Sequence, residues 1–137
     1  MSDKKVTVPH NYVTFEELLM NRHWEYPLTE LEAVNMARVW FRVNKLLSQY
    51  PPNMTGPKVS SGYRPGHYNK QAGGAAKSTH LSCEAVDIRD PGNALDQWLD
   101  QNPTKLIECE FWREAPDRSP GWCHLDIRPR KSRTFNP

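Results

Sequence analysis

The longest amphipathic pattern of the chain lies between Thr29 and Tyr50. Its apolar residues recur at steps of three and four positions, the spacing of one helical face: Met36, Val39, Trp40, Val43, Leu46, Leu47 and Tyr50. Thr29 and Glu32 form a capping box before this run, and Pro51-Pro52 follows it. We therefore predict one long helix whose apolar face packs into the core.

Two shorter helices are predicted on either side of this pattern. Thr14 and Glu17 form another capping box, which starts a short helix over about residues 15–22. Residues 93–100 place Leu95, Trp98 and Leu99 on the buried side of a helix. Residues 1–13 are predicted to be an extended N-terminal lead-in.

Four segments have the pattern of strands: residues 58–63, 85–88, 106–114 and 122–128. Alternation in the third places Ile107, Cys109 and Phe111 on one face and Glu108, Glu110, Trp112 and Glu114 on the other. In the fourth, Cys123, Leu125 and Ile127 share one face, opposite Trp122, His124, Asp126 and Arg128. Residues 116–121 are typical of a turn, and residues 65–77 of a loop with one helical turn near Tyr68. These elements predict an α+β domain in which helices pack against a small antiparallel sheet.

Composition narrows the class of protein. A chain of 137 residues fits a single domain, and a net charge of +2 does not indicate nucleic-acid binding. The basic run over residues 128–133 is interpreted as a solvated end. The three cysteines, Cys83, Cys109 and Cys123, form no CxxC pair and are expected to be free buried thiols. We find no apolar run of the roughly 18 residues that a membrane helix needs and no secretory signal, so we expect synthesis in the cytoplasm and no integral membrane association.

Candidate chemistry gathers around His80, Asp87 and His124. Two imidazoles and one carboxylate make a three-ligand set of the kind that holds a catalytic zinc ion and leaves the fourth position open. Taken singly, each residue has an ordinary structural explanation. His10, His23 and His67 lie outside this pattern and are not expected to bind metal.

Several short motifs occur together in one order: Ser61-Gly62-Tyr63-Arg64, Tyr68-Asn69, Gly73-Gly74-Ala75, Ser78-x-His80, Ala85-Val86-Asp87 and Trp122-x-His124. In this the chain resembles the family of zinc D-Ala-D-Ala carboxypeptidases and VanX-type dipeptidases, which includes phage L-alanyl-D-glutamate endolysins. The resemblance runs from about Phe15 to the C-terminus. It implies a fold like that of the hedgehog domain and the DD-peptidases, one Zn²⁺ per chain, and His80, Asp87 and His124 as its ligands.

The resemblance also implies roles for residues near these ligands. Arg64 matches the arginine that stabilises the oxyanion of the tetrahedral intermediate, although a structural salt bridge to a sheet carboxylate is the alternative. Ser78 matches a substrate contact, with capping of a strand end as the alternative, and Tyr63 and Trp122 are further candidates for substrate binding.

The sequence departs from the family pattern at two positions. Gly121 stands where the family has a glutamate three residues before the last zinc histidine, and Cys83 stands where a glycine is usual. The general base must then come from elsewhere. We predict Glu114, at the end of its strand, with Asp126 as the second choice. Glu108 and Glu110 are expected to brace the sheet or to pair with Arg64 or Arg128.

The resemblance implies a zinc-dependent peptidase that cleaves peptidoglycan stem peptides, and we expect it to be a monomer. A phage-encoded endolysin or virion lysin, acting on the wall after release or as part of the particle, fits the small single module. A non-hydrolytic, zinc-stabilised binding module of the same fold is the alternative, because Gly121 removes the usual glutamate.

Overall fold

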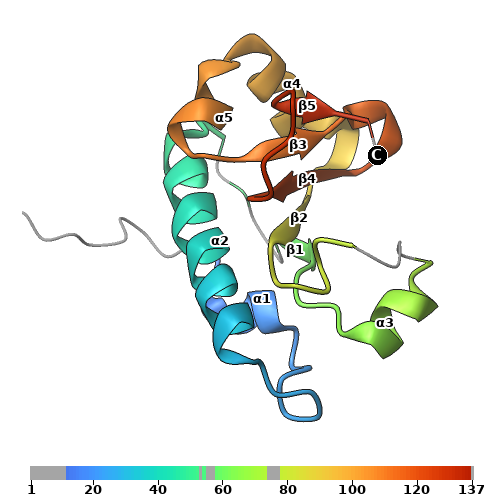
Figure 1. Ribbon diagram of the computed structural model, residues 1–137. Coiled ribbons are helices and arrows are strands. Elements are labelled where there is room, and N and C mark those ends of the chain that lie inside the picture. The colour runs from blue at the N-terminus through green and yellow to red at the C-terminus, as the bar shows by residue number, and fades with distance from the viewer. Residues whose placement is uncertain (1–11, 53, 55–57, 74–77, 137) are drawn as a thin grey trace, which may run out of the picture.

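The computed structural model describes residues 12–52, 54, 58–73 and 78–136. Its helices and strands, shown in Figure 1, follow in the order α1 (Phe15–Leu19), α2 (Glu30–Gln49), β1 (Val59–Ser61), α3 (Gly66–Gln71), β2 (Ala85–Arg89), α4 (Ala94–Gln101), α5 (Thr104–Glu108), β3 (Trp112–Glu114), β4 (Trp122–Asp126) and β5 (Thr134–Phe135). The α+β prediction is confirmed, with helices packed around one five-stranded sheet. None of the helices in the described ranges is both long and apolar enough to cross a membrane.

The long helix α2 forms as its pattern predicts. The hydroxyl of Thr29 accepts a hydrogen bond from the backbone N–H of Glu32, and the carboxylate of Glu32 accepts one from the N–H of Thr29. Val39, Val43 and Leu46, on its inner face, are fully buried. The helix runs beside the sheet, with α1 near its N-terminal end and α5 near its C-terminal end (Figure 1).

The N-terminal part of the described chain is tied to α2. Thr14 and Glu17 complete the predicted capping box of α1, but the helix ends at Leu19, because Met20 adopts a left-handed conformation with φ 53°. The side-chain amide of Asn44 accepts a hydrogen bond from the N–H of Val13 and donates one to its carbonyl. The predicted lead-in over residues 1–13 falls mostly outside the described residues.

The sheet has the strand order β1-β2-β4-β3-β5. Its central pair, β2 and β4, is antiparallel over five residues, and β1 and β3 join it as antiparallel neighbours. The antiparallel prediction is therefore confirmed for these three pairings. The two-residue strand β5 was not predicted, and it pairs in parallel with β3.

The prediction of a strand over residues 106–114 is wrong in its first half. Thr104–Glu108 forms the short helix α5, and only Trp112–Glu114 forms β3. Pro103 precedes the helix, a place where its fixed φ suits the start of a helix. As a result, Leu106 is buried while Ile107, predicted to share a face with Cys109 and Phe111, is 57% exposed.

This helix also moves two acidic residues away from the sheet. Glu108 pairs with Lys105 on the outside of α5, and Glu110 pairs with Arg42 of α2. Lys45 and Arg42 donate hydrogen bonds to the carbonyl oxygens of Glu108 and Glu110, which satisfies backbone acceptors at the end of α5. Contrary to prediction, the two glutamates pair with Lys105 and Arg42 instead of bracing the sheet or pairing with Arg64 or Arg128.

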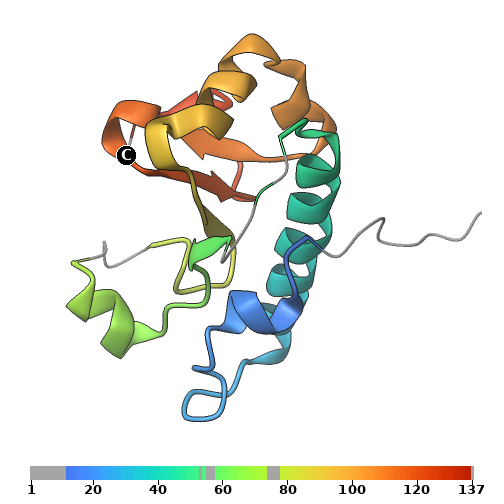
Figure 2. The same ribbon diagram turned by 180° about the vertical axis from the view of Figure 1, so that it is seen from behind.

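The two central strands separate the core from the polar side of the sheet. Val86 and Ile88 of β2 and Cys123 and Leu125 of β4 belong to one buried cluster with residues of α1, α2 and α4. Figure 2 shows the backbones of α2 and α4 next to these strands. Because side chains alternate along a strand, Asp87 and the residues flanking Leu125 point to the opposite side. The prediction of free, buried thiols is confirmed for all three cysteines.

Candidate metal centre

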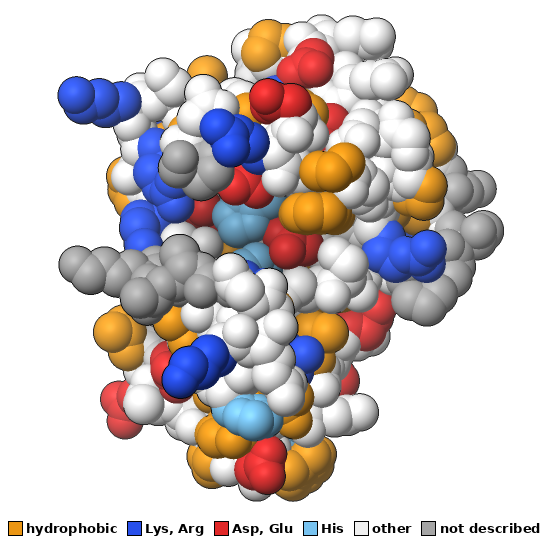
Figure 3. Space-filling model, turned by 90° about the vertical axis from the view of Figure 1, so that its right-hand side faces the viewer, with side chains coloured by type: hydrophobic (Ala, Val, Ile, Leu, Met, Phe, Trp, Pro, Cys, Tyr) orange, Lys and Arg blue, Asp and Glu red, His pale blue; other side chains and the backbone are white. Residues whose placement is uncertain are grey.

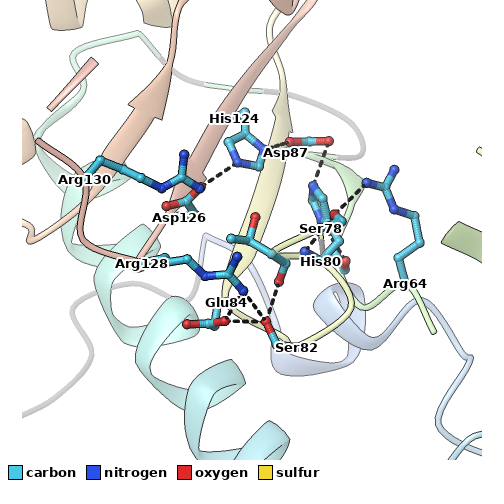
Figure 4. A network of polar contacts seen from close by, with 12 residues as sticks. Arg64, Ser78, His80, Ser82, Glu84, Asp87, His124, Asp126, Arg128 and Arg130 are labelled. Carbon is cyan, nitrogen blue, oxygen red and sulfur yellow. Dashed lines mark hydrogen bonds and ion pairs between the residues drawn. The ribbon is translucent and has the colours of Figure 1, made fainter. Parts of the chain in front are cut away.

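The candidate ligands meet on the polar side of the central strand pair. Asp87 on β2 lies directly opposite His124 on β4 in the strand register, and its Oδ1 is 2.7 Å from Nδ1 of His124. His80, in the loop before β2, places Nε2 3.2 Å from Oδ2 of Asp87. One donor atom from each residue lies within 4.8 Å of the others (Figure 4). The fold thus brings together three residues that are 44 positions apart at the extremes, and they could hold one metal ion.

The second nitrogen of each imidazole has its own partner. Nδ1 of His80 lies 2.9 Å from the carbonyl oxygen of Gly62, to which it donates a hydrogen bond when it carries the proton. Nε2 of His124 lies 2.9 Å from Oδ2 of the fully buried Asp126. Such partners orient metal-binding histidines and select their tautomers. Nε2 of His80 and Nδ1 of His124 are therefore the nitrogens left for a metal, and this donor set fits zinc.

The electrostatics of this cluster favour a cation. Burial alone would raise the pKa of Asp87, but the charge of His80 and hydrogen bonds from His124 and His80 hold the pKa well below its usual range. Burial would lower the pKa of His124, yet hydrogen bonds to Asp126 and Asp87 and the charges of both carboxylates raise the pKa to about 9. At neutral pH the metal-free cluster thus holds an ionised Asp87 beside a protonated His124, and a metal ion that bound there would displace a proton.

A cavity of about 380 Å³ opens over this cluster. Figure 3 shows histidine side chains at the bottom of a hollow, with acidic side chains beside them and basic side chains along one side. Among the residues around the cavity are the predicted site residues Arg64, Ser78, Glu114 and Trp122. The wall therefore combines a possible proton acceptor with cationic and aromatic groups.

Glu114 reaches the cavity because of the strand register. Trp112 and Arg113 of β3 lie opposite Asp126 and Leu125 of β4, so one further step along β3 brings Glu114 beside His124. Asp87, His124 and Glu114 then form a row across β2, β4 and β3. Burial raises the pKa of the Glu114 carboxyl, the charge of His124 lowers it, and the charges of Asp87 and Asp126 raise it, with a net rise.

Arg64 and Ser78 form a hydrogen-bonded group on the His80 side of the cavity. Nη2 of Arg64 donates to Oγ of Ser78 at 3.3 Å, and the same Oγ accepts from the backbone N–H of His80 at 3.2 Å. The described residues supply no ion pair to Arg64, so its alternative role in a structural salt bridge finds no support among them. Burial lowers the pKa of Arg64 and nearby Asp87 raises it, with a net decrease.

A comparison with protein families is consistent with this arrangement. The model of the family described as Peptidase M15 matches residues 12–113, well over half of the chain. The chain belongs to the peptidase M15 family. No curated protein and no solved structure matches it. Family membership makes it a metallopeptidase, in agreement with the resemblance seen in the sequence.

The match to the M15 family covers one side of the candidate site. It includes Arg64, His80 and Asp87 and ends immediately before Glu114. His124 lies outside the matched region, and the antiparallel pairing of β4 with β2 brings it next to Asp87.

Two predicted site residues of this M15 protein do not line the cavity. Tyr63 is buried in the core, where its hydroxyl donates to the carbonyl oxygen of Tyr26 at 3.1 Å, and burial raises its pKa to about 12. The backbone N–H of Tyr63 donates to the carbonyl oxygen of Leu18. Its side chain is buried in the core, so it is not placed to bind substrate.

Asp126 is the second predicted site residue that does not line the cavity. Its carboxylate is fully buried and lies against Nε2 of His124 and Nη2 of Arg130. It therefore cannot face a substrate as a general base, although it shares the face of β4 with His124 as predicted.

The C-terminal segment contributes residues that the sequence pattern did not identify. Arg130 and Phe135 line the cavity, as does Arg118 from the turn between β3 and β4. The basic run over residues 128–133 was predicted to be a solvated end, but Arg128 pairs with Glu84 and Arg130 with Asp126. In the sequence, the one sign of this role is that Arg128 and Arg130 follow the strand of His124 within a few residues.

Both departures from the family pattern lie where φ is positive. Cys83 has φ 61° and Gly121 has φ 91°. A glycine at the position of Cys83 would adopt this conformation without steric cost, which accounts for the glycine usual there. The Cys83 side chain is fully buried in the core rather than in the cavity.

Proposed function

We propose that this protein is a zinc-dependent peptidase that cleaves bonds in the stem peptides of bacterial peptidoglycan. The observation that supports it most directly is the His80–Asp87–His124 group beneath an open cavity. Family membership supports the reaction class. The earlier motifs resemble those of enzymes that act on cell-wall peptides, and this resemblance supports the substrate class.

Metal binding requires Asp87 as a carboxylate and both histidines neutral, so His124 must first release the proton that it carries at neutral pH. When bound, a zinc ion supplies Lewis acidity that polarises the scissile carbonyl and lowers the pKa of water. Asp87 would hold the ion through its carboxylate, and His80 and His124 through the nitrogens that face Asp87.

Glu114 takes the role of general base in this proposal. It lies in the cavity wall beside His124, and the raised pKa of its carboxyl brings it closer to the range in which one group can accept and return a proton near neutral pH. Its carboxylate accepts the proton of the attacking water and passes it to the departing amine. Gly121 has no side chain that could do so.

Arg64 stabilises the negative charge that develops on the scissile carbonyl oxygen. Its guanidinium is held against Ser78 at the cavity wall, and the buried Nε has no acceptor among the residues described. A donor fixed before the reaction begins loses little free energy to reorganisation. Ser78 and Trp122 also line the cavity, which supports their proposed role in binding the peptide.

A phage-encoded lysin is the biological setting that we propose. The enzyme would reach the wall after release from the cell or as part of a virion, and it would act as a monomer. A non-hydrolytic, zinc-stabilised module that binds the wall is the second candidate, and Gly121 is the observation in its favour.

The test is digestion of purified peptidoglycan followed by mass spectrometry of the products. We expect cleavage within stem peptides, loss of cleavage with a chelator, and recovery when zinc is restored. Glu114→Gln should keep zinc but lose about 10²-fold or more in rate. The matched control is Glu108→Gln, since Glu108 lies on the outside of α5, and this variant should remain active.

The outcomes separate the candidates. Absence of any product at every zinc loading, with retained binding to the wall, would support the non-hydrolytic module instead. An active Glu114→Gln enzyme would show that another group accepts the proton.

A further inference from the structure

Asp126 is a buried carboxylate whose hydrogen bonds serve another side chain. It is 0% exposed, and its Oδ2 lies 2.9 Å from Nε2 of His124 and 3.1 Å from Nη2 of Arg130. Since a buried charge is costly unless it is paired, Arg130 supplies the compensating cation. Figure 4 shows the three side chains in sequence, with Asp87 on the far side of the His124 ring.

Arg130 is itself held in place by an aromatic ring. Its guanidinium carbon lies 3.8 Å from the centre of the Phe135 ring, within the range of a cation–π contact. The Phe135 ring also meets the His124 ring edge-on, with centroids 6.3 Å apart and planes at 87°. The imidazole thus contacts the same residue that supports Arg130.

Phe135 belongs to β5, whose backbone is joined to β3. The N–H of Ala115 donates to the carbonyl of Phe135 at 2.7 Å, and the N–H of Arg113 donates to that of Arg133 at 2.6 Å. Glu114 lies between these two bonds and faces Phe135 in the parallel register. The C-terminal segment therefore contacts both the strand of His124 and the strand of Glu114.

We propose that Arg130, Asp126 and Phe135 form a positioning device for His124. Asp126 keeps a proton on Nε2 and thereby directs Nδ1 toward the metal, while Arg130 and Phe135 hold Asp126 and the ring in that orientation. This proposal rests on the proposed function, because it assigns a role relative to a zinc ion bound by His124. None of the three residues is catalytic in this sense, since each acts through His124.

The test measures metal binding by the full-length protein, with zinc or Co²⁺ alone as the probe. Partners of metal-binding histidines typically contribute 10–100-fold to metal affinity. We expect Asp126→Ala to raise the zinc dissociation constant about 10–100-fold in chelator competition and to change the visible spectrum of the Co²⁺ form. We also expect kcat to fall while KM changes little, because Asp126 does not reach the cavity.

Variants of Arg130 test the device without removing the buried carboxylate. Arg130→Gln should raise the zinc dissociation constant, and Arg130→Lys should recover part of the loss because it restores the positive charge. Arg128→Gln is the matched control: Arg128 lies on the same segment but pairs with Glu84, and zinc binding should be unchanged. If Asp126→Ala does not fold, the zinc affinities of Arg130→Gln and Arg130→Lys test the proposal on their own.

A wild-type zinc dissociation constant and Co²⁺ spectrum in both Asp126→Ala and Arg130→Gln would overturn the proposal, even if either variant melts at a lower temperature. That result differs from failure of the proposed function, in which the unaltered protein itself would bind no zinc or cleave no peptide.

Discussion

Replacing Arg113 with methionine is predicted to destabilise the whole domain. Arg113 lies on β3 next to Glu114 but is 3% exposed. Its guanidinium donates to the backbone carbonyl of Asp96 at 2.8 Å and to the Asp100 carboxylate at 2.6 Å, and it also donates to Thr134 of β5. One side chain thus connects α4, β3 and β5.

The magnitude follows from what the substitution leaves behind. Asp96 is 1% exposed and lies 3.3 Å from Arg113, so in Arg113→Met its carboxylate remains buried without its cation. Breaking a buried pair from one side costs about 3–5 kcal/mol. For a domain of this size, each kcal/mol corresponds to roughly 3–5 °C, so we expect the melting temperature to fall by roughly 10–25 °C.

Urea and thermal unfolding followed by circular dichroism measure this effect. Arg89→Met, at an exposed position of β2, should change stability by no more than about 0.5 kcal/mol. A double variant that also carries Asp96→Asn should recover part of the loss, because the unpaired charge is then removed. If Arg113→Met costs less than about 1 kcal/mol, the reasoning from a buried, uncompensated charge is refuted.

Further predictions concern the metal site and its supports. Gly62→Ala should destabilise the fold by about 2 kcal/mol or more, since an added Cβ would lie 2.2 Å from the carbonyl oxygen of Leu18; unaltered urea unfolding would contradict this. Zinc affinity should fall by about tenfold per pH unit as the pH falls below about 9, because His124 with its raised pKa must release a proton to bind. Chelator competition from pH 7 to 9 should show this slope, and a flat profile would argue against metal binding at His124. Zinc removal should lower the melting temperature, because a ligand that binds only the folded state stabilises it. Burial raises the pKa of Cys83 to about 12 and that of Cys109 to about 11, so both thiols should resist alkylation at neutral pH until the protein unfolds.

Local signals were sufficient for much of the fold. The capping boxes at Thr14 and Thr29 placed the starts of α1 and α2, because they depend on contacts three residues apart. The strand periodicity around His124 correctly separated its face from that of Leu125. The same alternation gave a wrong prediction over residues 106–114, which include most of the five-residue helix α5. A segment this short contains only two or three apolar residues, and their spacing fits a helix as well as a strand.

The site residues that belong to recognisable motifs could be predicted from the sequence. Those whose positions depend on contacts between distant segments could not. The grouping of His80, Asp87 and His124 was anticipated from residue types and resemblance, and the structure brings them together. The place of Tyr63 in the core involves a backbone bond to Leu18, far away in sequence. The place of Arg130 and Phe135 depends on β5 joining β3 in parallel, and a two-residue strand has no periodicity to read.

The backbone at Gly121 has a consequence for how this protein can change. Its φ of 91° lies in a region that residues with a side chain rarely adopt. A substitution that restored the family glutamate at this position would strain the turn before β4, at a cost of order 1–3 kcal/mol, although no neighbouring atom blocks the space. The turn would have to change its conformation together with the side chain. A single Gly121→Glu substitution should therefore give a less stable protein, and a glutamate at this position would need further changes in the turn.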